Sequence, residues 1–187
     1  ALVASGIGAH DTFTWFLEVV PVILVVPLLV ATHRRFPLTT LLTVLVAVHA
    51  CILMIGGHWT YAEVPFGFWL RDVLHLARNP YDRIGHFAQG FVPAIAVREV
   101  LWRRSPLRGS PKWIFFLTTS VCLAISAAYE LFEWSVAEAT GTAADAFLGS
   151  QGDPWDTQWD MFTCLCGALV AQLVLSRLHD AQLRRVP

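Results

Sequence analysis

Long apolar runs dominate the order of hydrophobic and polar positions along this chain. A helix needs about 18 to 20 mainly apolar residues to cross the hydrocarbon core of a bilayer. Five runs reach that length, at 13–31, 38–55, 84–102, 113–134 and 159–176. Because lipid offers the backbone no hydrogen-bond partner, each run is expected to be helical. The pattern predicts an all-α, polytopic membrane protein, a bundle of about five transmembrane helices that forms a single transmembrane domain over residues 1–187.

A shorter segment between the second and third runs has an amphipathic pattern. From Val64 to Arg78, apolar residues recur at helical spacing on one face, and polar residues occupy the other. The apolar face holds Phe66, Trp69, Leu70, Val73, Leu74 and Ala77, and the polar face holds Arg71, Asp72, His75 and Arg78. The pattern is typical of an external interfacial helix lying among lipid headgroups, and it fits equally a lid packed on the protein.

The composition argues against a water-soluble protein. Only 14% of the 187 residues are charged and 56% are hydrophobic, whereas a soluble domain carries about 25% charged residues. The net charge of −1 gives no electrostatic basis for binding nucleic acid. No basic region precedes the first run, which favours a retained span over a cleaved signal peptide. The cysteines lie inside apolar runs and are interpreted as small buried hydrophobic residues, Cys51, Cys122, Cys164 and Cys166.

The charged residues divide between the two ends of the predicted spans. Ten of the 13 Lys and Arg residues fall on one side together with only Glu99 and Asp180, and the other side holds 12 of the 14 acids. Lys and Arg collect in short cytoplasmic loops of membrane proteins. We therefore expect the N-terminus outside, the C-terminus in the cytoplasm, and nearly every acid at the outer face.

Ionisable residues gather at the outer ends of the third, fourth and fifth spans. They recur at spacings of three or four residues, which places them on one face of each helix. The third span offers Asp82 and His86, the fourth Glu130 and Glu133, and the fifth Asp156 and Asp160, which follow Gln151 and Asp153. The loop after the second span is expected to bring His58 and Glu63 to the same point.

Helix capping explains some of these acids without any further role. Asp82 and Asp156 each follow a proline at a typical helix start, where a carboxylate favours the helix dipole, and Asp153 is interpreted as an N-cap. Capping does not explain the rest, because a charged group in hydrocarbon costs about 2.5 to 3.5 kcal/mol. These unexplained residues are His86, Glu130, Glu133 and Asp160.

Three ways of offsetting that cost stay open. The carboxylates are neutralised by nearby cations in an inert clasp, for which the sequence offers Arg71, Arg78, Arg83 and His86. Alternatively, a divalent metal such as Zn, Mn or Fe is bound, since His and carboxylates from several helices resemble known ligand sets. In the third explanation, close carboxylates share protons, as in proton-coupled transport.

Several polar residues inside the spans have simpler interpretations. Glu18, about one turn into the first span, either extends outward to the interface, which we favour, or joins the polar layer. His49 is interpreted as a hydrogen-bonded core histidine, and Arg98 and Glu99 as interface anchors at the inner end of the third span.

Four sequence blocks resemble a known family. The blocks are HWTYAEVPFGFW from His58, YDRIGHFAQG from Tyr81, YELFEW from Tyr129 and LGSQGDPWDTQWDM from Leu148. Together they are similar to the YjdF-like family of predicted bacterial inner-membrane proteins, with a looser similarity to VanZ-like membrane proteins. The resemblance implies a location in the bacterial inner membrane and a multi-pass architecture, and it supplies no reaction.

The residues support one functional hypothesis and one alternative. In the hypothesis, the metal ligands at the outer face are His58, His86, Glu130, Glu133 and Asp160. The residues that orient these ligands or line the pocket are Glu63, Tyr61, Tyr81, Asp82, Gln151, Asp153 and Asp156, of which Asp82 and Asp156 are alternatively further ligands. Metal-activated water would then permit hydrolysis or transfer on a lipid headgroup or another polar substrate. In the alternative, the chain is a non-catalytic accessory subunit bound to other integral membrane proteins, and the acidic layer is a structural clasp.

Overall fold

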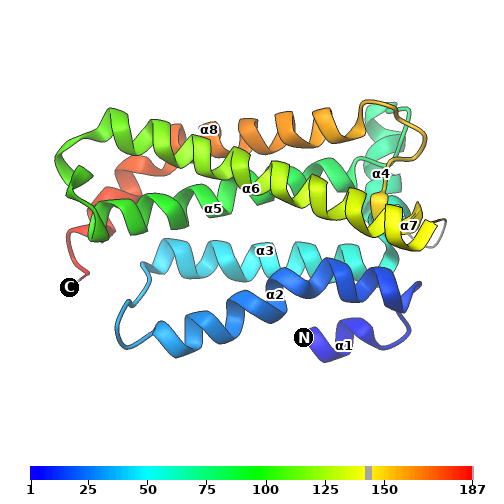
Figure 1. Ribbon diagram of the computed structural model, residues 1–187, viewed down its shortest axis with the longest axis horizontal. Helices are drawn as coiled ribbons and strands as arrows, with labels where there is room; N and C mark the ends of the chain where they lie inside the picture. The colour runs from blue at the N-terminus through cyan, green and yellow to red at the C-terminus, as the bar shows by residue number, and fades with distance from the viewer. Residues whose placement is uncertain (142–144, 187) are drawn as a thin grey trace.

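The computed structural model describes residues 1–141 and 145–186 and is helical along most of that length. Four helices are long and apolar enough to cross a membrane: α2 (Thr12–Thr32), α3 (Thr40–Trp59), α6 (Pro111–Thr140) and α8 (Asp156–Leu183). They lie side by side with α5 (Tyr81–Arg104), which has a comparable length (Figure 1). The predicted all-α polytopic bundle is confirmed, although the third predicted span belongs to a helix more polar than the other four.

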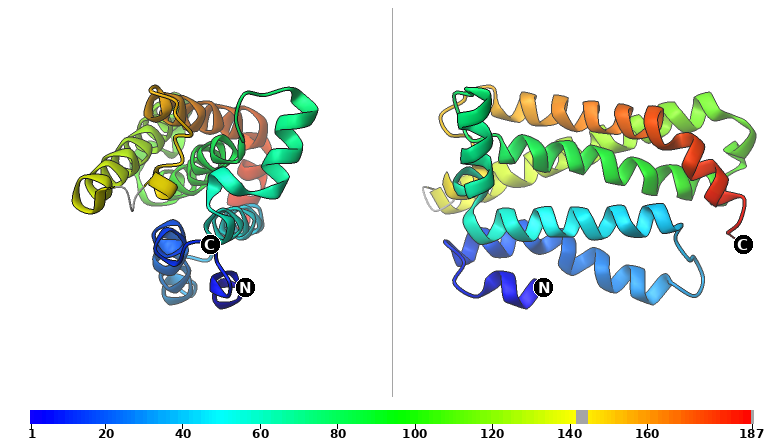
Figure 2. Two further views of the ribbon diagram at one scale, coloured as in Figure 1. Left: turned by 90° about the vertical axis from the view of Figure 1, so that its right-hand side faces the viewer. Right: turned by 180° about the vertical axis from the view of Figure 1, so that it is seen from behind.

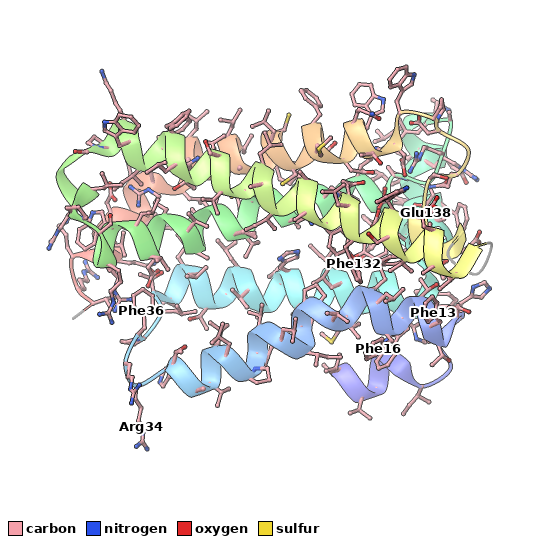
Figure 3. All side chains as sticks on the ribbon, in the orientation of Figure 1. Phe13, Phe16, Arg34, Phe36, Phe132 and Glu138 are labelled. Atoms are coloured by element: carbon pink, nitrogen blue, oxygen red, sulfur yellow. The ribbon has the colours of Figure 1, made fainter. Side chains whose placement is uncertain are left out.

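The polarity of α5 follows from its central position. It packs against α3, α6 and α8, so that 11 of its 24 residues are buried. A helix surrounded by other helices can carry polar groups that lipid would not tolerate, since those groups find partners in the protein. The outward surfaces of the other helices are apolar and exposed instead, as expected where the surroundings are lipid. Figure 3 shows Phe13 and Phe16 of α2 on such a surface.

The local sequence fixes where the helices begin. Asp11 accepts a hydrogen bond from Thr14 N at 2.6 Å and caps α2, and this bond lowers the pKa of the Asp11 carboxyl below its ordinary value. Thr39 caps α3 in the same way through Leu42 N. At the start of α5, the side-chain oxygen of Asn79 accepts from Tyr81 N at 3.0 Å. The expected helix start before the third run is therefore confirmed.

Short elements close the ends of the bundle. They are α1 (Leu2–Gly6), the 3-10 helices η1 (Tyr61–Glu63) and η2 (Pro106–Gly109), α4 (Pro65–Leu74) and α7 (Asp145–Leu148). The helix predicted between the second and third runs is α4, which ends at Leu74 because His75 adopts a left-handed conformation. It lies across the end of the bundle (Figure 2, right). Phe66 and Trp69 are exposed while Gly67 is buried against Asn79, so α4 combines an exposed aromatic face with a face packed on the protein.

The two ends of the bundle differ in charge, as the sequence predicts. We call the end where α5 and α8 begin the acidic end, and the end where these two helices stop the basic end. Glu138 lies at the acidic end and Arg34 extends from the basic end (Figure 3).

A buried ionic network at the basic end corrects the interpretation of Arg98 and Glu99 as interface anchors. The Glu99 carboxylate is fully buried and accepts hydrogen bonds from the Thr39 hydroxyl at 2.7 Å and from Arg103 at 2.8 Å. His179 of α8, which is also fully buried, lies between Glu99 at 3.1 Å and Arg98 at 3.1 Å. Spacing along the sequence does not predict this network, because its members come from three separate segments of the chain.

Two glycines allow the backbones of α5 and α8 to touch. A Cβ atom on Gly90 would overlap the carbonyl oxygen of Cys164, and one on Gly167 would overlap the carbonyl oxygen of Phe87. Small residues at helix crossings permit this close approach in membrane proteins. The crossing positions the first turns of α5 and α8 beside each other at the acidic end.

Gly90→Ala is expected to separate α5 from α8, because the added methyl group meets rigid backbone and no flexible side chain can move aside. Overpacking of this kind costs about 1–3 kcal/mol or more, which thermal unfolding of purified protein in detergent would measure. Gly109→Ala is the matched control, since a Cβ there meets no atom within 4 Å. Equal melting temperatures for the two variants would contradict the close crossing.

Glu99→Ala is expected to destabilise the bundle by about 3–5 kcal/mol, because it leaves buried cationic and imidazole groups without their partner. The control is Glu138→Ala, which removes an exposed carboxylate at the other end. Chemical unfolding of both variants in detergent checks the difference. A Glu99→Ala protein as stable as its control would show that the network does not hold the helices together.

Candidate functional site

The first turns of α5 and α8 and the last turns of α6 bring their acids to one place at the acidic end. Asp82, His86 and Asp160 are all buried, and one ligand atom of each lies within 4.8 Å of the others. His86 Nε2 is 3.5 Å from Asp82 Oδ1 and 3.7 Å from Asp160 Oδ1. The convergence of three predicted spans on one polar layer is therefore present in the structure.

The opposite edge of the imidazole faces α6. His86 Nδ1 lies 3.1 Å from the side-chain oxygen of Gln89 and 3.7 Å from Glu130 Oε1. Glu130 Oε1 is buried and has no hydrogen-bond partner within the described part of the chain. His86 thus stands between the two aspartates and a carboxylate oxygen whose hydrogen-bonding capacity is unused.

Two arginines neutralise the side of the group that faces α8. Arg78 lies 2.6 Å from Asp156, and Arg83 lies 2.8 Å from the same carboxylate and also forms an ion pair with Asp160. Arg78 further donates to the carbonyl oxygens of Gly149 and Ser150. This part of the layer is an ionic clasp that ties the loop before α8 to the start of α5, although the buried Nε atom of Arg78 has no hydrogen-bond partner among the described residues.

A second part of the layer lacks such cations. Glu18, Glu130 and Glu133 are 5%, 7% and 8% exposed. The hydroxyl of Tyr129 is 3.5 Å from Glu18, and no Arg or Lys forms an ion pair with any of the three among the described residues. The expectation that Glu18 extends outward is wrong, because its side chain points into the bundle. An ionisable residue within an apolar span is costly in lipid, and this cost was the signal in the sequence that Glu18 faces the interior of the bundle.

Other predicted site residues have structural partners elsewhere. His58 Nδ1 donates a hydrogen bond to the carbonyl oxygen of Ser5 in α1, 2.9 Å away, and Glu63 is exposed, so neither joins the buried group. The Tyr81 hydroxyl donates to Ile52 O at 3.0 Å. Gln151 bonds both the N–H and the carbonyl oxygen of Asn79, each at 3.0 Å.

The remaining charged residues near the layer also differ from expectation. Asp153 lies 3.6 Å from Arg78 and 3.4 Å from Arg83, and it accepts a hydrogen bond from Trp155 N in the turn before α8. It is not the N-cap, which is Trp155 itself. Arg71, a predicted member of the clasp, pairs with Asp72 on the surface.

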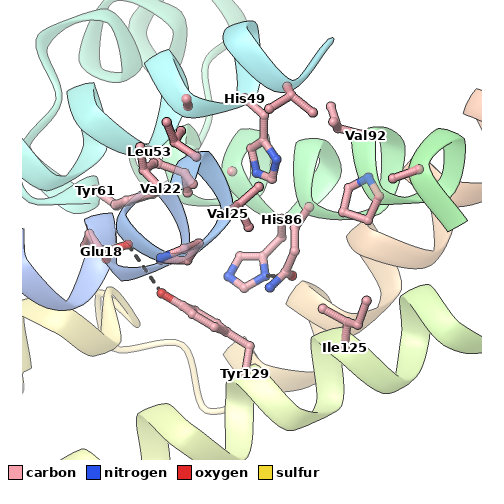
Figure 4. Close-up of a pocket in the computed structure, with 18 of the residues that line it drawn as sticks. Glu18, Val22, Val25, His49, Leu53, Tyr61, His86, Val92, Ile125 and Tyr129 are labelled. Carbon is pink, nitrogen blue, oxygen red and sulfur yellow. Dashed lines mark hydrogen bonds between the residues drawn. The ribbon is translucent and has the colours of Figure 1, made fainter. Parts of the chain in front are cut away.

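A cavity of about 410 Å³ opens beside the group, between α2, α3, α5 and α6. Its polar lining includes Glu18, Asp82, His86, Glu133 and Tyr129, while most of its remaining wall is aliphatic (Figure 4). Tyr61 also lines it, and burial raises the pKa of this phenol well above its ordinary value, so Tyr61 stays protonated. The volume lies within the range of about 300–1,000 Å³ typical of ligand sites.

His49 of α3 faces the same cavity (Figure 4). Its Nε2 atom is buried and has no hydrogen-bond partner in the described residues. The interpretation of His49 as a hydrogen-bonded core residue is therefore wrong. A single apolar helix gives no sign of which neighbours surround one of its residues, so the sequence could not place His49 at a cavity.

Comparison with known proteins identifies relatives of the whole chain. Residues 1–181 match the model of a family described as predicted membrane protein DUF2238. The chain is 57% identical over 184 residues to the inner membrane protein YjdF of Escherichia coli strain K12, covering 98% of this chain and 88% of that protein. No solved structure matches it significantly. The chain therefore belongs to the DUF2238 family of multi-pass membrane proteins.

Proposed function

We propose that the acidic end binds a divalent cation between Asp82, His86 and Asp160, with Glu130 as a further ligand. The observation that carries this proposal is the buried Glu130 Oε1 atom, which has no hydrogen-bond partner in the described structure and lies 3.7 Å from His86 Nδ1. An unsatisfied buried acceptor costs about 1–3 kcal/mol, and more when it is charged. A bound cation would offset this cost.

The charge balance of the layer supports the same proposal. Arg78 and Arg83 are already engaged with the aspartates of α8 and with Asp82. The glutamates on the other side of His86 therefore need protons or an additional cation. One imidazole with several carboxylates suits Zn, Mn or Fe. In this proposal Asp82 is a direct ligand, and the predicted ligand His58 has no part.

A cation in this position would face a polar substrate. A cation there would supply Lewis-acid chemistry for activating water and polarising a phosphoryl or carbonyl oxygen, and Glu133, which is not among its ligands, would accept the proton that the water loses. The proposed reaction class is hydrolysis or group transfer at a lipid headgroup. Its support is the shared position of the buried acids and the polar end of the cavity.

We place the acidic end outside the cytoplasm in the bacterial inner membrane, with the N-terminus outside and the C-terminus inside. The basic residues at the opposite end support this orientation. The name of the Escherichia coli relative, an inner membrane protein, supports only the choice of membrane. The proposed chemistry would then act on the outer leaflet.

The arginine clasp favours a second candidate function. Arg78 and Arg83 neutralise the carboxylates of α8 without any metal ion. In that function the chain is an accessory subunit that packs through its apolar faces against other integral membrane proteins. Its acidic layer would then serve only to hold the loop before α8 in place.

Elemental analysis tests the cation directly. Purified protein, after equilibration with Mn, Zn or Fe and removal of free metal, is expected to hold about one equivalent of one of these metals. His86→Ala and Glu130→Gln are expected to lower its affinity at least about tenfold, while Glu138→Gln, which alters an exposed carboxylate, leaves it unchanged.

Thermal unfolding of the same variants separates the two functions. The cation proposal expects the variants to stay folded while metal is lost. The accessory function expects His86→Ala and Glu130→Gln to lose the fold or a copurifying membrane protein at fixed stoichiometry. A folded wild-type protein without any stoichiometric metal would overturn the cation proposal.

Reporter fusions test the orientation. A green fluorescent protein fused after the C-terminus is expected to fluoresce, because that end is proposed to lie in the cytoplasm, and alkaline phosphatase fused there is expected to be inactive. The reverse pair of results would place the acidic end in the cytoplasm.

A further inference from the structure

The cavity beside the acidic group has two chemically different parts. Its polar end carries the carboxylates of Glu18, Asp82 and Glu133 together with His86. Its longer part is apolar and runs away from that end along the helices. The apolar wall consists of Pro21, Val22, Val25, Val26, Val46, Leu53, Val92, Pro93, Ala96, Val97 and Ile125. A ligand that fills both parts must be amphipathic.

The helices that border the cavity leave a side of it toward the bilayer. In the described residues, α2 packs mainly on α3 and α6 packs mainly on α5 and α8, while α2 and α6 share no extended packing. Both nonetheless contribute to the cavity wall, α2 through Val25 and α6 through Ile125. Viewed along the bundle, α2 and α6 lie on the same flank (Figure 2, left), and near the acidic end the short helix α7 packs against both.

Two prolines bend α2 away from α3. Pro21 and Pro27 lie inside this helix, and Pro21 lines the cavity. A proline within a helix removes a backbone hydrogen bond and bends the helix. In Figure 1 the later part of α2 diverges from α3. This later part of α2 contributes Val25 and Val26 to the apolar wall of the cavity.

His49 marks the depth at which a polar ligand atom is needed. It lies 10 residues before α3 ends at Trp59, whereas His86 lies 5 residues after α5 begins at Tyr81. At 1.5 Å per residue, His49 is about 7 Å deeper than His86, counted from the acidic ends of their helices. In a glycerophospholipid, the ester groups follow the phosphate at a similar depth, and the acyl chains continue beyond them.

We infer that the cavity binds a glycerophospholipid that enters from the bilayer between α2 and α6. One acyl chain occupies the apolar part, an ester oxygen accepts a hydrogen bond from His49, and the phosphate lies at the polar end. The inference names the substrate class of the proposed function and rests on it in one respect. The phosphate and the carboxylates of Glu18 and Glu133 are all negatively charged, so a phosphate in this position needs the bound cation between it and these carboxylates.

Photolabelling tests the acyl-chain position. The full chain is reconstituted in vesicles of phosphatidylethanolamine and phosphatidylglycerol that contain a phosphatidylglycerol with a diazirine on one acyl chain. After illumination, peptide mass spectrometry is expected to find label on Val22 and Val92, which line the cavity but are only 7% and 5% exposed. Lipid that merely surrounds the protein labels exposed residues such as Leu173 and Val174 instead.

A matched pair of variants shows whether the label comes from inside the cavity. Ala96→Phe places a ring in the apolar part, and Ala47→Phe places the same ring on the exposed surface of α3. The first is expected to lower labelling of Val22 and Val92 at least about fivefold relative to Leu173, and the second is expected to leave that ratio unchanged. Labelling confined to exposed residues in the wild-type protein would overturn the inference. This test does not depend on whether the variants fold.

Chelation and competition separate this inference from the proposed function. An excess of soluble glycerol phosphate, which has no acyl chain, is expected not to reduce cavity labelling, and reduction to background would show that the site takes a free phosphate compound. If cavity labelling persists with EDTA in a protein shown to hold no metal, the inference of a bound lipid stands and the proposal of a bound cation is overturned. If the protein holds stoichiometric metal but the cavity is not labelled, the inference of a bound lipid is overturned and the proposal of a bound cation stands.

Discussion

Neutralisation of buried charge on the central helix is the constraint on which this structure depends. Helix α5 carries ionic groups near both ends, and in lipid none of them would find a partner. The bundle meets this requirement with a different device at each end. At the basic end, Glu99 is fully hydrogen bonded by residues of α3, α5 and α8. At the acidic end, Arg78 and Arg83 neutralise only the side toward α8, and this asymmetry sets the chemistry of the remaining carboxylates apart.

The sequence predicts the elements well because hydrophobic periodicity is a local property. The run at 113–134 lies within α6, and the segment after the second run contains α4. Spacing along each helix also predicts that Asp82, His86 and Asp160 lie at one end. What it cannot predict is the set of partners across helices. The burial of Glu99 against His179, and of Glu18 inside the bundle, depends on which faces meet after packing.

The same reasoning explains why only some of the predicted ligands lie together in the structure. His58 stands at the end of α3, and its position relative to the acids depends on how α1 packs beside it. The sequence left Asp82 as a helix cap, an orienting residue or a further ligand, and in the structure its carboxylate lies next to His86. A metal centre needs suitable ligand types at suitable mutual distances. The ligand types can be read from the sequence, whereas the distances depend on how the helices pack.

The close backbone contact at Gly90 and Gly167 has a mechanical consequence. It makes α5 and α8 a stiff unit, whereas the hairpin of α2 and α3 meets the rest of the bundle along a looser seam. A compressive force in the plane of the membrane therefore acts first on that seam. Changes in bilayer thickness or lateral pressure would alter the width between the two units and leave the spacing of Asp82 and Asp160 intact, because those two residues belong to the stiff unit.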